Sequence, residues 1–360
     1  MMRFRYIITV LFSVMTLLSC SGTVDSSSLP ILTVSDTEID MATESQAVFT
    51  VTYNGVDVTA DSEVFGADGT RLESGVFTPE AEGSKTFYAV YASKQSNTVS
   101  VNVVNTSVKV DSKYDRHVCV VEFTGAWCVN CPEGYDKMMG ILSKPALKKY
   151  IENIHICAFH SDLEGIDTLA VAQTQDLFKL FDGLSYPSFA TDFRDSGVLT
   201  SEGASLFQPS LMTSFNEYPA HCGVAVSSVL NENASEAEIT VRLTSELTSQ
   251  YRVVVLVVQN NIKGYQKTPT YSEGQDDYIH SHVVRKVVTS YKGTFTGEKM
   301  NEGGTVAAGD EVAKEWTVEV DSKWALENTE IYALALDNKG YVNNMNVCAI
   351  DGGDSGYDLK

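Results

Sequence analysis

Short segments near the start of the chain alternate in part between apolar and polar residues, and this pattern predicts β-strands. Between 29 and 104 these segments are rich in β-branched and aromatic residues, as in Ala47 to Tyr53, Thr86 to Tyr91 and Thr98 to Val104. Asn54-Gly55 is the kind of dipeptide that turns one strand back onto the next. We therefore predict a small β-sandwich over 29–104.

A second β-rich region extends from 220 to 350, followed by a tail at 351–360. Its predicted strands are apolar runs bounded by turn residues: Val224 to Val229, Ala237 to Leu243, Tyr251 to Gln259, His282 to Thr289, Trp316 to Val320 and Ile331 to Leu336. Asn260 to Asp277 is predicted to be a long loop. The number and spacing of these strands favour a second β-sandwich.

The region between them, 105–219, has a mixed pattern that predicts an α/β domain. Val118 to Phe123 and Asn153 to His160 are short apolar runs typical of buried strands. Helices are predicted where apolar residues recur at helical spacing: Tyr135, Met138, Met139 and Leu142, then Thr168 to Phe181, and finally Phe207 to Phe215, beginning near Pro209.

Two cysteines stand where the first buried strand gives way to a helix, in Trp127-Cys128-Val129-Asn130-Cys131-Pro132. Unpaired backbone N–H groups and the helix dipole stabilise negative charge at a helix N-terminus. A thiolate on Cys128 is therefore favoured there, and the thiolate is the species that attacks disulfides. Cys131 lies about one helical turn further on and can form a disulfide with Cys128.

This segment resembles the active-site strand and helix of thioredoxin-like proteins, through Val121-Glu122-Phe123 and Trp127-Cys128-x-x-Cys131. The resemblance implies that Cys128 is the nucleophile, that Cys131 is the resolving thiol, and that Glu122 is a buried acid that moves protons. It also implies a cis-proline beside the disulfide, for which Pro187 is the best match. Trp127 and Pro187 would then shape the surface on which a partner docks.

Two other interpretations of the cysteine pair stay open. The cysteines can be structural or idle within a fold that serves only as a scaffold. A zinc site is disfavoured, because no second Cys-x-x-Cys and no paired His-Cys spacing accompanies the first. His280 and His282 form a candidate metal half-site on one strand face, without a third ligand, and His160 is either a satisfied strand-end residue or faces the cysteines.

The first residues have the features of an export signal. Arg3 and Arg5 precede an apolar core from Tyr6 to Leu18, which is shorter than the roughly 20 residues that span a bilayer. Leu17-Leu18-Ser19-Cys20 resembles a bacterial lipobox, which implies cleavage after 19 and lipidation of Cys20. The small polar residues at 20–28 suit a flexible tether. A plain secretory peptide is the alternative, and both place the chain outside the cytoplasm.

Charge and cysteine content narrow the range of functions. The formal net charge of −21 makes a nucleic-acid partner improbable, because phosphate backbones are bound by basic surfaces. Disulfides persist outside the cytoplasm. Cys119 and Cys157 are predicted to be inert buried thiols or neighbours, and Cys222 and Cys348 could close a disulfide across the last region.

Two further resemblances concern larger parts of the chain. Gly75-Val76-Phe77-Thr78-Pro79 lies in a stretch that resembles bacterial immunoglobulin-like repeats, which implies a spacer or, alternatively, a carbohydrate- or protein-binding module. Val118 to Ile350, including Tyr278-Ile279-His280-Ser281-His282, is similar to lipoproteins of the 28-kilodalton outer-membrane-protein family. That similarity implies an envelope location, with redox or adhesion roles.

Together these patterns predict a lipoprotein anchored to the cell envelope, in the outer membrane of a Gram-negative bacterium, with an immunoglobulin-like β-sandwich, a thioredoxin-like α/β domain and a C-terminal β-sandwich. The function predicted is thiol–disulfide exchange with exported proteins, with a redox partner to recycle the pair and no dissociable cofactor. The alternative is a non-catalytic binding or adhesion lipoprotein. An exposed Cys128 with Pro187 facing it favours the enzyme; a covered cysteine pair favours the scaffold.

Overall fold

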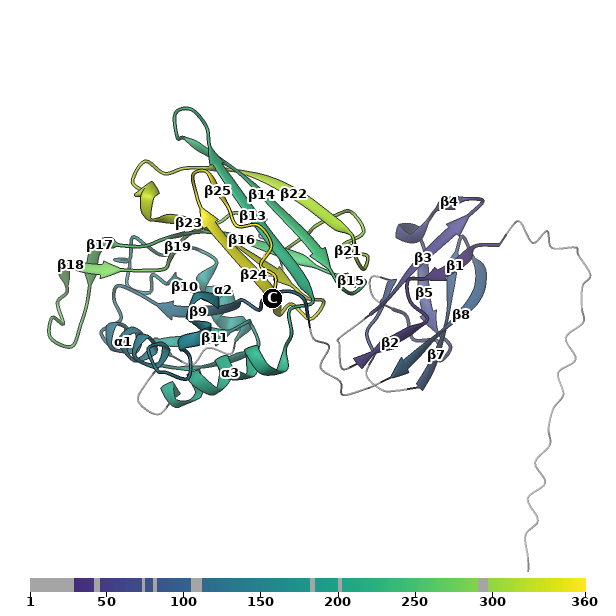
Figure 1. Cartoon of the computed structure of the whole chain (residues 1–360), viewed down its shortest axis with the longest axis horizontal. Helices are drawn as coiled ribbons and strands as arrows, with labels where there is room; N and C mark the ends of the chain where they lie inside the picture. The colour runs from purple at the N-terminus through teal and green to yellow at the C-terminus, as the bar shows by residue number, and fades with distance from the viewer. Residues whose placement is uncertain are drawn as a thin grey trace, which may run out of the picture.

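The computed structural model describes residues 29–41, 46–72, 75–79, 83–104, 112–181, 185–199, 203–290 and 297–360. The described part is mostly β-sheet, and Figure 1 shows a small N-terminal β body beside a larger body that carries the helices. The predicted signal segment, Cys20 and the predicted tether lie outside the described residues.

The N-terminal body consists of two four-stranded sheets packed face to face. One contains β1 (Ile31–Val34), β3 (Ala47–Tyr53), β4 (Val56–Asp57) and β6 (Val76–Phe77), and the other contains β2 (Glu38–Asp40), β8 (Lys94–Val104), β7 (Gly83–Tyr91) and β5 (Glu63–Gly66). Leu32, Phe49 and Val51 from the first sheet meet Phe87 and Val101 from the second in a shared core. This arrangement is consistent with the predicted β-sandwich.

A nine-stranded sheet runs through the larger body. Along the sheet its strands are β12 (Asp195–Val198), β11 (Ser188–Thr191), β9 (Val118–Thr124), β10 (Ile154–His160), β19 (Val283–Val287), β16 (Arg252–Gln259), β23 (Thr329–Leu336) and β24 (Val342–Ala349), with β20 (Glu298–Lys299) paired to β16. β9 and β10 are parallel, and β11 is antiparallel to β9. The sheet therefore continues across residue 219, the predicted boundary between two domains.

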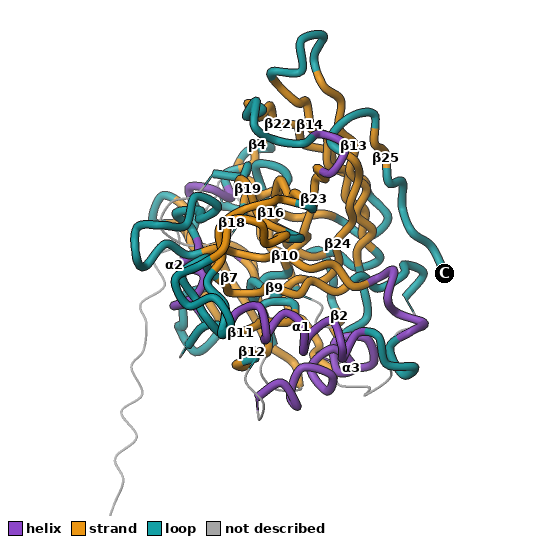
Figure 2. Tube along the Cα trace, turned by 90° about the vertical axis from the view of Figure 1, so that its left-hand side faces the viewer, coloured by secondary structure: helices purple, strands orange, loops and turns teal. Residues whose placement is uncertain are grey.

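Helices cover both faces of the sheet near β9. α1 (Cys131–Leu142) and α3 (Phe207–Glu217) lie on one face, while α2 (Thr174–Leu180) lies on the other; Figure 2 shows α1 and α3 below β9 and β10. Successive strand residues point to opposite faces, so Val118 and Val120 pack under α1 and α3, whereas Cys119 and Val121 face α2. By the same alternation Glu122 faces α1.

A four-stranded antiparallel sheet packs on the far half of the large sheet. It contains β22 (Glu311–Glu319), β14 (Glu236–Ser245), β13 (Cys222–Leu230) and β25 (Gly353–Asp354). β16 is buried on both sides, because Val253 and Val255 face this second sheet while Val254 and Leu256 face the core beneath α2. The layered arrangement is consistent with the predicted C-terminal sandwich.

Three predicted elements differ from the structure. The helix predicted over Thr168 to Phe181 is confined to α2, because the preceding residues form turns. The long loop predicted from Asn260 to Asp277 contains a β-hairpin, β17 (Ile262–Gln266) paired with β18 (Gln275–His280). The strand β24 was not predicted, because its asparagines at 343, 344 and 346 interrupt the apolar pattern.

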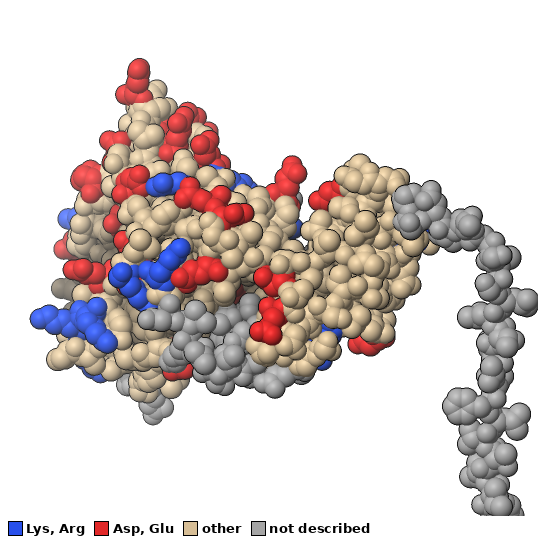
Figure 3. All heavy atoms as spheres, turned by 45° about the vertical axis from the view of Figure 1, so that its right-hand side comes forward, with Lys and Arg blue, Asp and Glu red and all other residues tan. Residues whose placement is uncertain are grey.

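The remaining short elements among the described residues are the strand pair β15 (Ser249–Gln250) and β21 (Thr305–Val306) and the 3₁₀ helices η3 (Thr59–Asp61), η5 (Lys148–Asn153), η6 (Gly203–Leu206) and η7 (Leu326–Asn328). The outward residues of β14 and β22 are strongly acidic, including the exposed Glu236, Glu238, Glu315 and Glu319. Figure 3 shows carboxylates gathered over this upper end. Such a face repels polyanions.

Candidate functional site

The two cysteines of the predicted site form a disulfide at the start of α1, with their Cα atoms 5.4 Å apart. β9 ends at Thr124, a tight turn follows in which the Cys128 N–H donates to the Gly125 carbonyl over 3.0 Å, and Cys131 is the first residue of the helix. Pro132 occupies the first turn, where its missing N–H leaves no hydrogen bond unmade.

The disulfide is largely covered. The exposed fraction is 5 % for Cys128 and 1 % for Cys131, so Cys128 is the more accessible of the two but does not protrude into solvent. This degree of cover is greater than expected for an open attacking sulfur.

Pro187 lies against the helix that begins with Cys131. The Tyr186–Pro187 peptide bond is cis, and Pro187 directly precedes β11, the strand beside β9. A Cβ atom added to Gly134 would come within 2.4 Å of the Pro187 ring. The absence of a side chain at Gly134 therefore allows the proline to approach the first turns of α1.

Replacing Gly134 by alanine is expected to force Pro187 and α1 apart, at a cost of about 1–3 kcal/mol in the free energy of unfolding. Gly140 in the same helix provides the control, because an added Cβ there meets nothing within 4 Å. Gly140→Ala is expected to stabilise the protein by up to about 1 kcal/mol through helix propensity. Urea unfolding of both variants tests the contact; equal effects at the two positions would contradict it.

Trp127 lies beside the disulfide, and two contacts fix the position of its indole ring. Its indole N–H donates to the Ser161 carbonyl over 2.7 Å, and its ring meets the edge of Tyr186 with centroids 5.3 Å apart. Tyr186 stacks in turn on Phe178 of α2. Trp127 therefore belongs to an aromatic cluster with Tyr186 and Phe178, and Pro187 directly follows Tyr186 in the chain.

Glu122 is buried with an exposed fraction of 2 %, on the face of β9 that lies under α1. Burial raises the pKa of its carboxyl group to about 8, because the charged form loses its hydration. Glu122 is therefore predominantly protonated at neutral pH, and a neutral carboxylic acid at this position can give a proton to the thiolate that forms when the disulfide is opened.

A small cavity connects Glu122 to the disulfide. It has a volume of about 20 Å³, room for about one water molecule. Its lining combines residues of β9, α1, β10 and the β17–β18 hairpin: Glu122, Thr124, Cys131, Pro132, Tyr135, Ala158, His160, Gln266, Tyr278, Ile279, His280 and Ser281. The sequence left two possibilities open for His160, and both hold. It is a histidine at a strand end whose ring is hydrogen-bonded, and it lines the cavity beside the cysteine pair.

Asp167 is a site residue that the sequence did not reveal. Its carboxylate accepts hydrogen bonds from the His160 ring over 2.8 Å and from the Ala126 N–H over 2.6 Å. Burial acts to raise the pKa of Asp167, but these bonds and the one from the Leu169 N–H hold it below its usual value. Asp167 is therefore ionised and ties His160 to the turn before Cys128.

The β17–β18 hairpin, which was predicted to be a loop, covers another side of the turn before Cys128. The Gln266 amide donates to the carbonyls of Cys128 over 3.0 Å and Gly125 over 3.3 Å, and the Lys267 N–H donates to the Ala126 carbonyl over 2.8 Å. Only the run Tyr278-Ile279-His280 hinted at a strand here. Residues far along the chain therefore hold the turn that presents the disulfide.

The other cysteines within the described residues do not form disulfides. Cys119 and Cys157 are buried free thiols on neighbouring strands, with their sulfurs 3.9 Å apart. The disulfide suggested between Cys222 and Cys348 is absent, because both are buried free thiols. The Cys222 thiol instead donates to the Asn343 side chain over 3.3 Å.

The expectation that His280 and His282 share a strand face is wrong. His280 is the last residue of β18, whereas His282 has a φ of 57° in the turn before β19. His280 packs on the His160 ring at 5.1 Å between centroids. Across the described ranges, no cluster of three or more His, Cys, Asp or Glu residues could hold a metal ion.

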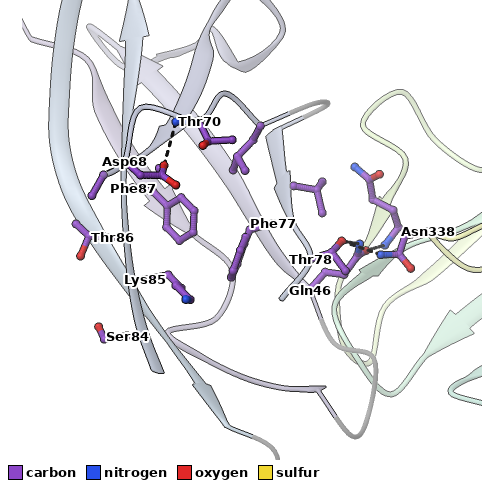
Figure 4. A pocket seen from close by; sticks show the side chains of 15 residues that line it. Gln46, Asp68, Thr70, Phe77, Thr78, Ser84, Lys85, Thr86, Phe87 and Asn338 are labelled. Atoms are coloured by element: carbon purple, nitrogen blue, oxygen red, sulfur yellow. Dashed lines mark hydrogen bonds between the residues drawn. The ribbon is translucent and has the colours of Figure 1, made fainter. Parts of the chain in front are cut away.

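A larger open pocket, of about 970 Å³, lies between the N-terminal sandwich and the larger body, which contributes Gln250 of β15 and Asn338. Figure 4 shows Phe77, Phe87 and Lys85 on one side and Asn338 on the other. Thr78 accepts hydrogen bonds from Gln46 over 2.8 Å and from Asn338 over 3.0 Å, which joins the two bodies at this point.

Cys20, the predicted lipidation residue, lies outside the described residues. Among the helices that are described, none combines the length and apolar character needed to cross a bilayer.

One part of the chain matches a known protein family. The model of the family described as outer membrane protein Omp28 matches residues 199–352. The resemblance predicted over Val118 to Ile350 is therefore matched from 199 onward, which includes the β17–β18 hairpin but not the cysteine pair. No curated protein sequence matches the chain.

Two solved structures give a measure of similarity. HBP35 of Porphyromonas gingivalis aligns with a TM-score of 0.53 and 16 % identity, covering 67 % of this chain and 77 % of that one, and this likeness shows a shared fold alone. The surface layer protein SbsC, domains 4–9, aligns with a TM-score of only 0.18 at 14 % identity, covering 89 % and 50 %, and supports no argument. The Omp28 match supports a location for this chain in the outer membrane or cell envelope.

Proposed function

We propose that this protein is an envelope lipoprotein that exchanges thiols and disulfides with exported proteins. The observation that carries the proposal is the grouping of the Cys128–Cys131 disulfide, Pro187 and the buried Glu122 around the start of α1. In this proposal 105–219 is a thioredoxin-like domain, 29–104 is an added immunoglobulin-like spacer, 220–350 is the C-terminal sandwich, and lipid on Cys20 anchors the chain.

The exchange proceeds in two steps. A thiolate of a partner protein attacks the Cys128 sulfur, forming a mixed disulfide and releasing the Cys131 sulfur as a thiolate. The Cys131 thiolate takes a proton, which the neutral Glu122 can supply across the cavity. A second partner thiolate then attacks the mixed disulfide, so the partner leaves with a new disulfide and the cysteine pair holds both electrons. The same steps in reverse reduce a partner.

In this proposal Trp127 and Pro187 form part of the surface on which a partner docks, supported by the position of Trp127 next to Cys128 and of Pro187 against Gly134 of α1. The rigid cluster of Trp127 and Tyr186 offers a fixed apolar surface beside Cys128. A redox partner in the envelope must return the pair to its starting state, because one exchange converts it. The chemistry needs no dissociable cofactor.

A second candidate is favoured by two observations. Cys128 is only 5 % exposed, and the open pocket between the N-terminal sandwich and Asn338 has a volume of about 970 Å³. Both fit a surface binding or adhesion lipoprotein in which the disulfide only stabilises the turn before α1. Reactivity of the disulfide distinguishes the two functions.

Equilibration of the protein with glutathione buffers, followed by alkylation and mass measurement, tests the exchange. We expect the Cys128–Cys131 pair to titrate between about −120 and −300 mV, the range of thiol–disulfide proteins. Cys131→Ser is expected to leave Cys128 free and to accumulate a mixed disulfide with glutathione. The Cys128→Ser/Cys131→Ser double variant, which keeps the four buried thiols, is expected to accumulate none.

The opposite result is equally clear. If millimolar dithiothreitol fails to reduce the native disulfide, and Cys131→Ser forms no more adduct than the double variant, the pair is structural and the binding function is preferred.

A further inference from the structure

The cavity beside the disulfide contains a second acid–base group besides Glu122. His160, at the end of β10, is 2 % exposed and lines this cavity together with Cys131 and Glu122. His160 therefore shares one cavity with the buried acid and with the cysteine whose sulfur the exchange releases.

Hydrogen bonding fixes which nitrogen of His160 is available. Nδ1 lies 2.8 Å from a carboxylate oxygen of Asp167, and an ionised carboxylate only accepts, so Nδ1 carries the hydrogen. Nε2 is then the acceptor nitrogen of the ring. When Nε2 takes a proton, the Asp167 carboxylate stabilises the positive charge that forms.

In the neighbouring His280 the roles of the two ring nitrogens are reversed. Its Nε2 lies 3.2 Å from the Tyr265 carbonyl, so that nitrogen donates, and no carboxylate bonds to its ring among the described residues. Burial, with the nearby His160, lowers the pKa of His280 to about 4. His280 therefore resists taking a proton, although it lines the same cavity.

We propose that His160, oriented by Asp167, is a second proton acceptor for the Cys131 thiol and works with Glu122 across the cavity. This inference rests on the proposed thiol–disulfide exchange. During formation of the disulfide, the Cys131 thiol of a mixed disulfide gives its proton to His160 Nε2 or to the Glu122 carboxylate. The resulting thiolate attacks the Cys128 sulfur, the Cys128–Cys131 bond forms, and the partner leaves as a thiolate.

The titratable groups around His160 come from every element packed on the cavity: Glu122 of β9, Cys131 and Tyr135 of α1, Asp167 before α2, and Tyr278 and His280 of β18. Glu122 is ionised and able to accept mainly above pH 8, since burial raises its pKa to about 8. The contribution of His160 is therefore expected to be largest below that pH, where the Glu122 carboxyl group still holds its proton.

The test measures the rate at which the reduced full-length protein closes its disulfide. Reduced protein is mixed with oxidised glutathione, and resolution of the mixed disulfide is followed between pH 5.5 and pH 9 by acid quenching and mass measurement. His160→Asn is the informative variant, because its amide nitrogen can replace Nδ1 as donor to Asp167 while Nε2 is removed. His280→Gln is the matched control, because its amide can still donate to the Tyr265 carbonyl.

We expect His160→Asn to slow resolution at least tenfold at pH 6.5, within the range of general base catalysis, and by less than about threefold at pH 9. His280→Gln is expected to follow the wild type within about twofold throughout. A His160→Asn profile parallel to that of the wild type, or equal losses in both variants, overturns the role of His160. Failure of the wild type to form any mixed disulfide overturns the proposed function instead.

Discussion

Glu122→Gln is expected to stabilise the protein strongly at alkaline pH and hardly at all at acid pH. The carboxyl group is 2 % exposed, and burial without a compensating cation or hydrogen bond among the described residues raises its pKa from 4.5 to about 8. At about 1.4 kcal/mol per pKa unit, ionising Glu122 in the folded state costs about 5 kcal/mol. A glutamine removes that cost.

The direction of the effect follows from proton binding. Between pH 4.5 and 8 the unfolded chain has released the Glu122 proton while the folded protein retains it. The folded state therefore binds more protons than the unfolded state, and stability falls as the pH rises through this window. Above pH 8 both states are ionised, and the penalty reaches its full size of about 5 kcal/mol.

Urea unfolding of the oxidised protein at pH 4, 6, 8 and 9 measures the effect. The difference between Glu122→Gln and the wild type should grow from near zero at pH 4 to several kcal/mol at pH 9. Glu133→Gln is the control, because Glu133 is an exposed partner of Lys137 and its loss costs less than about 1 kcal/mol. Unfolding curves whose separation does not change with pH would show that Glu122 is not buried as a neutral acid.

The parts of the site that could be predicted from the sequence are those encoded within one short segment. The apolar run before Cys128 and the helical spacing after it locate the disulfide at the start of α1, as the structure places it. The resemblance of the same segment to thioredoxin-like proteins implies a buried acid at Glu122, and Glu122 is buried and lines the cavity beside Cys131. Both features lie within one segment and need no knowledge of distant contacts.

The rest depends on contacts between distant segments. Gln266 reaches the Cys128 carbonyl from a hairpin more than a hundred residues away, and Asp167 acts from a turn without periodic pattern. Polar hairpin residues look like a loop, because their burial comes from the partner surface and not from their own alternation. The apolar run of β16 could have predicted part of this arrangement. Such a run indicates a strand buried on both faces, and hence a sheet shared by the two regions predicted as separate domains.

Arg116 is a second buried group that the sequence did not predict, and it stabilises the junction of the shared sheet. Its guanidinium pairs with Asp192 and donates to the carbonyls of Tyr218 over 3.0 Å and Val342 over 3.2 Å. Asp192 also accepts the Cys119 N–H over 2.9 Å. One ion pair thus joins the residues before β9, after β11, after α3 and at the start of β24.

Arg116→Met is expected to lower the free energy of unfolding by about 3–5 kcal/mol, because it leaves the Asp192 carboxylate buried without its partner. Adding Asp192→Asn should recover at least half of that loss, since the double variant buries no unpaired charge while the amide oxygen introduced at this position can still accept the Cys119 N–H. Arg242→Met, which breaks a half-exposed pair with Asp354, should cost less than about 1 kcal/mol. Urea unfolding at pH 7 compares the variants. If the double variant is as unstable as Arg116→Met, the loss comes from the missing carbonyl contacts, and the sheet is held by hydrogen bonds alone at this junction.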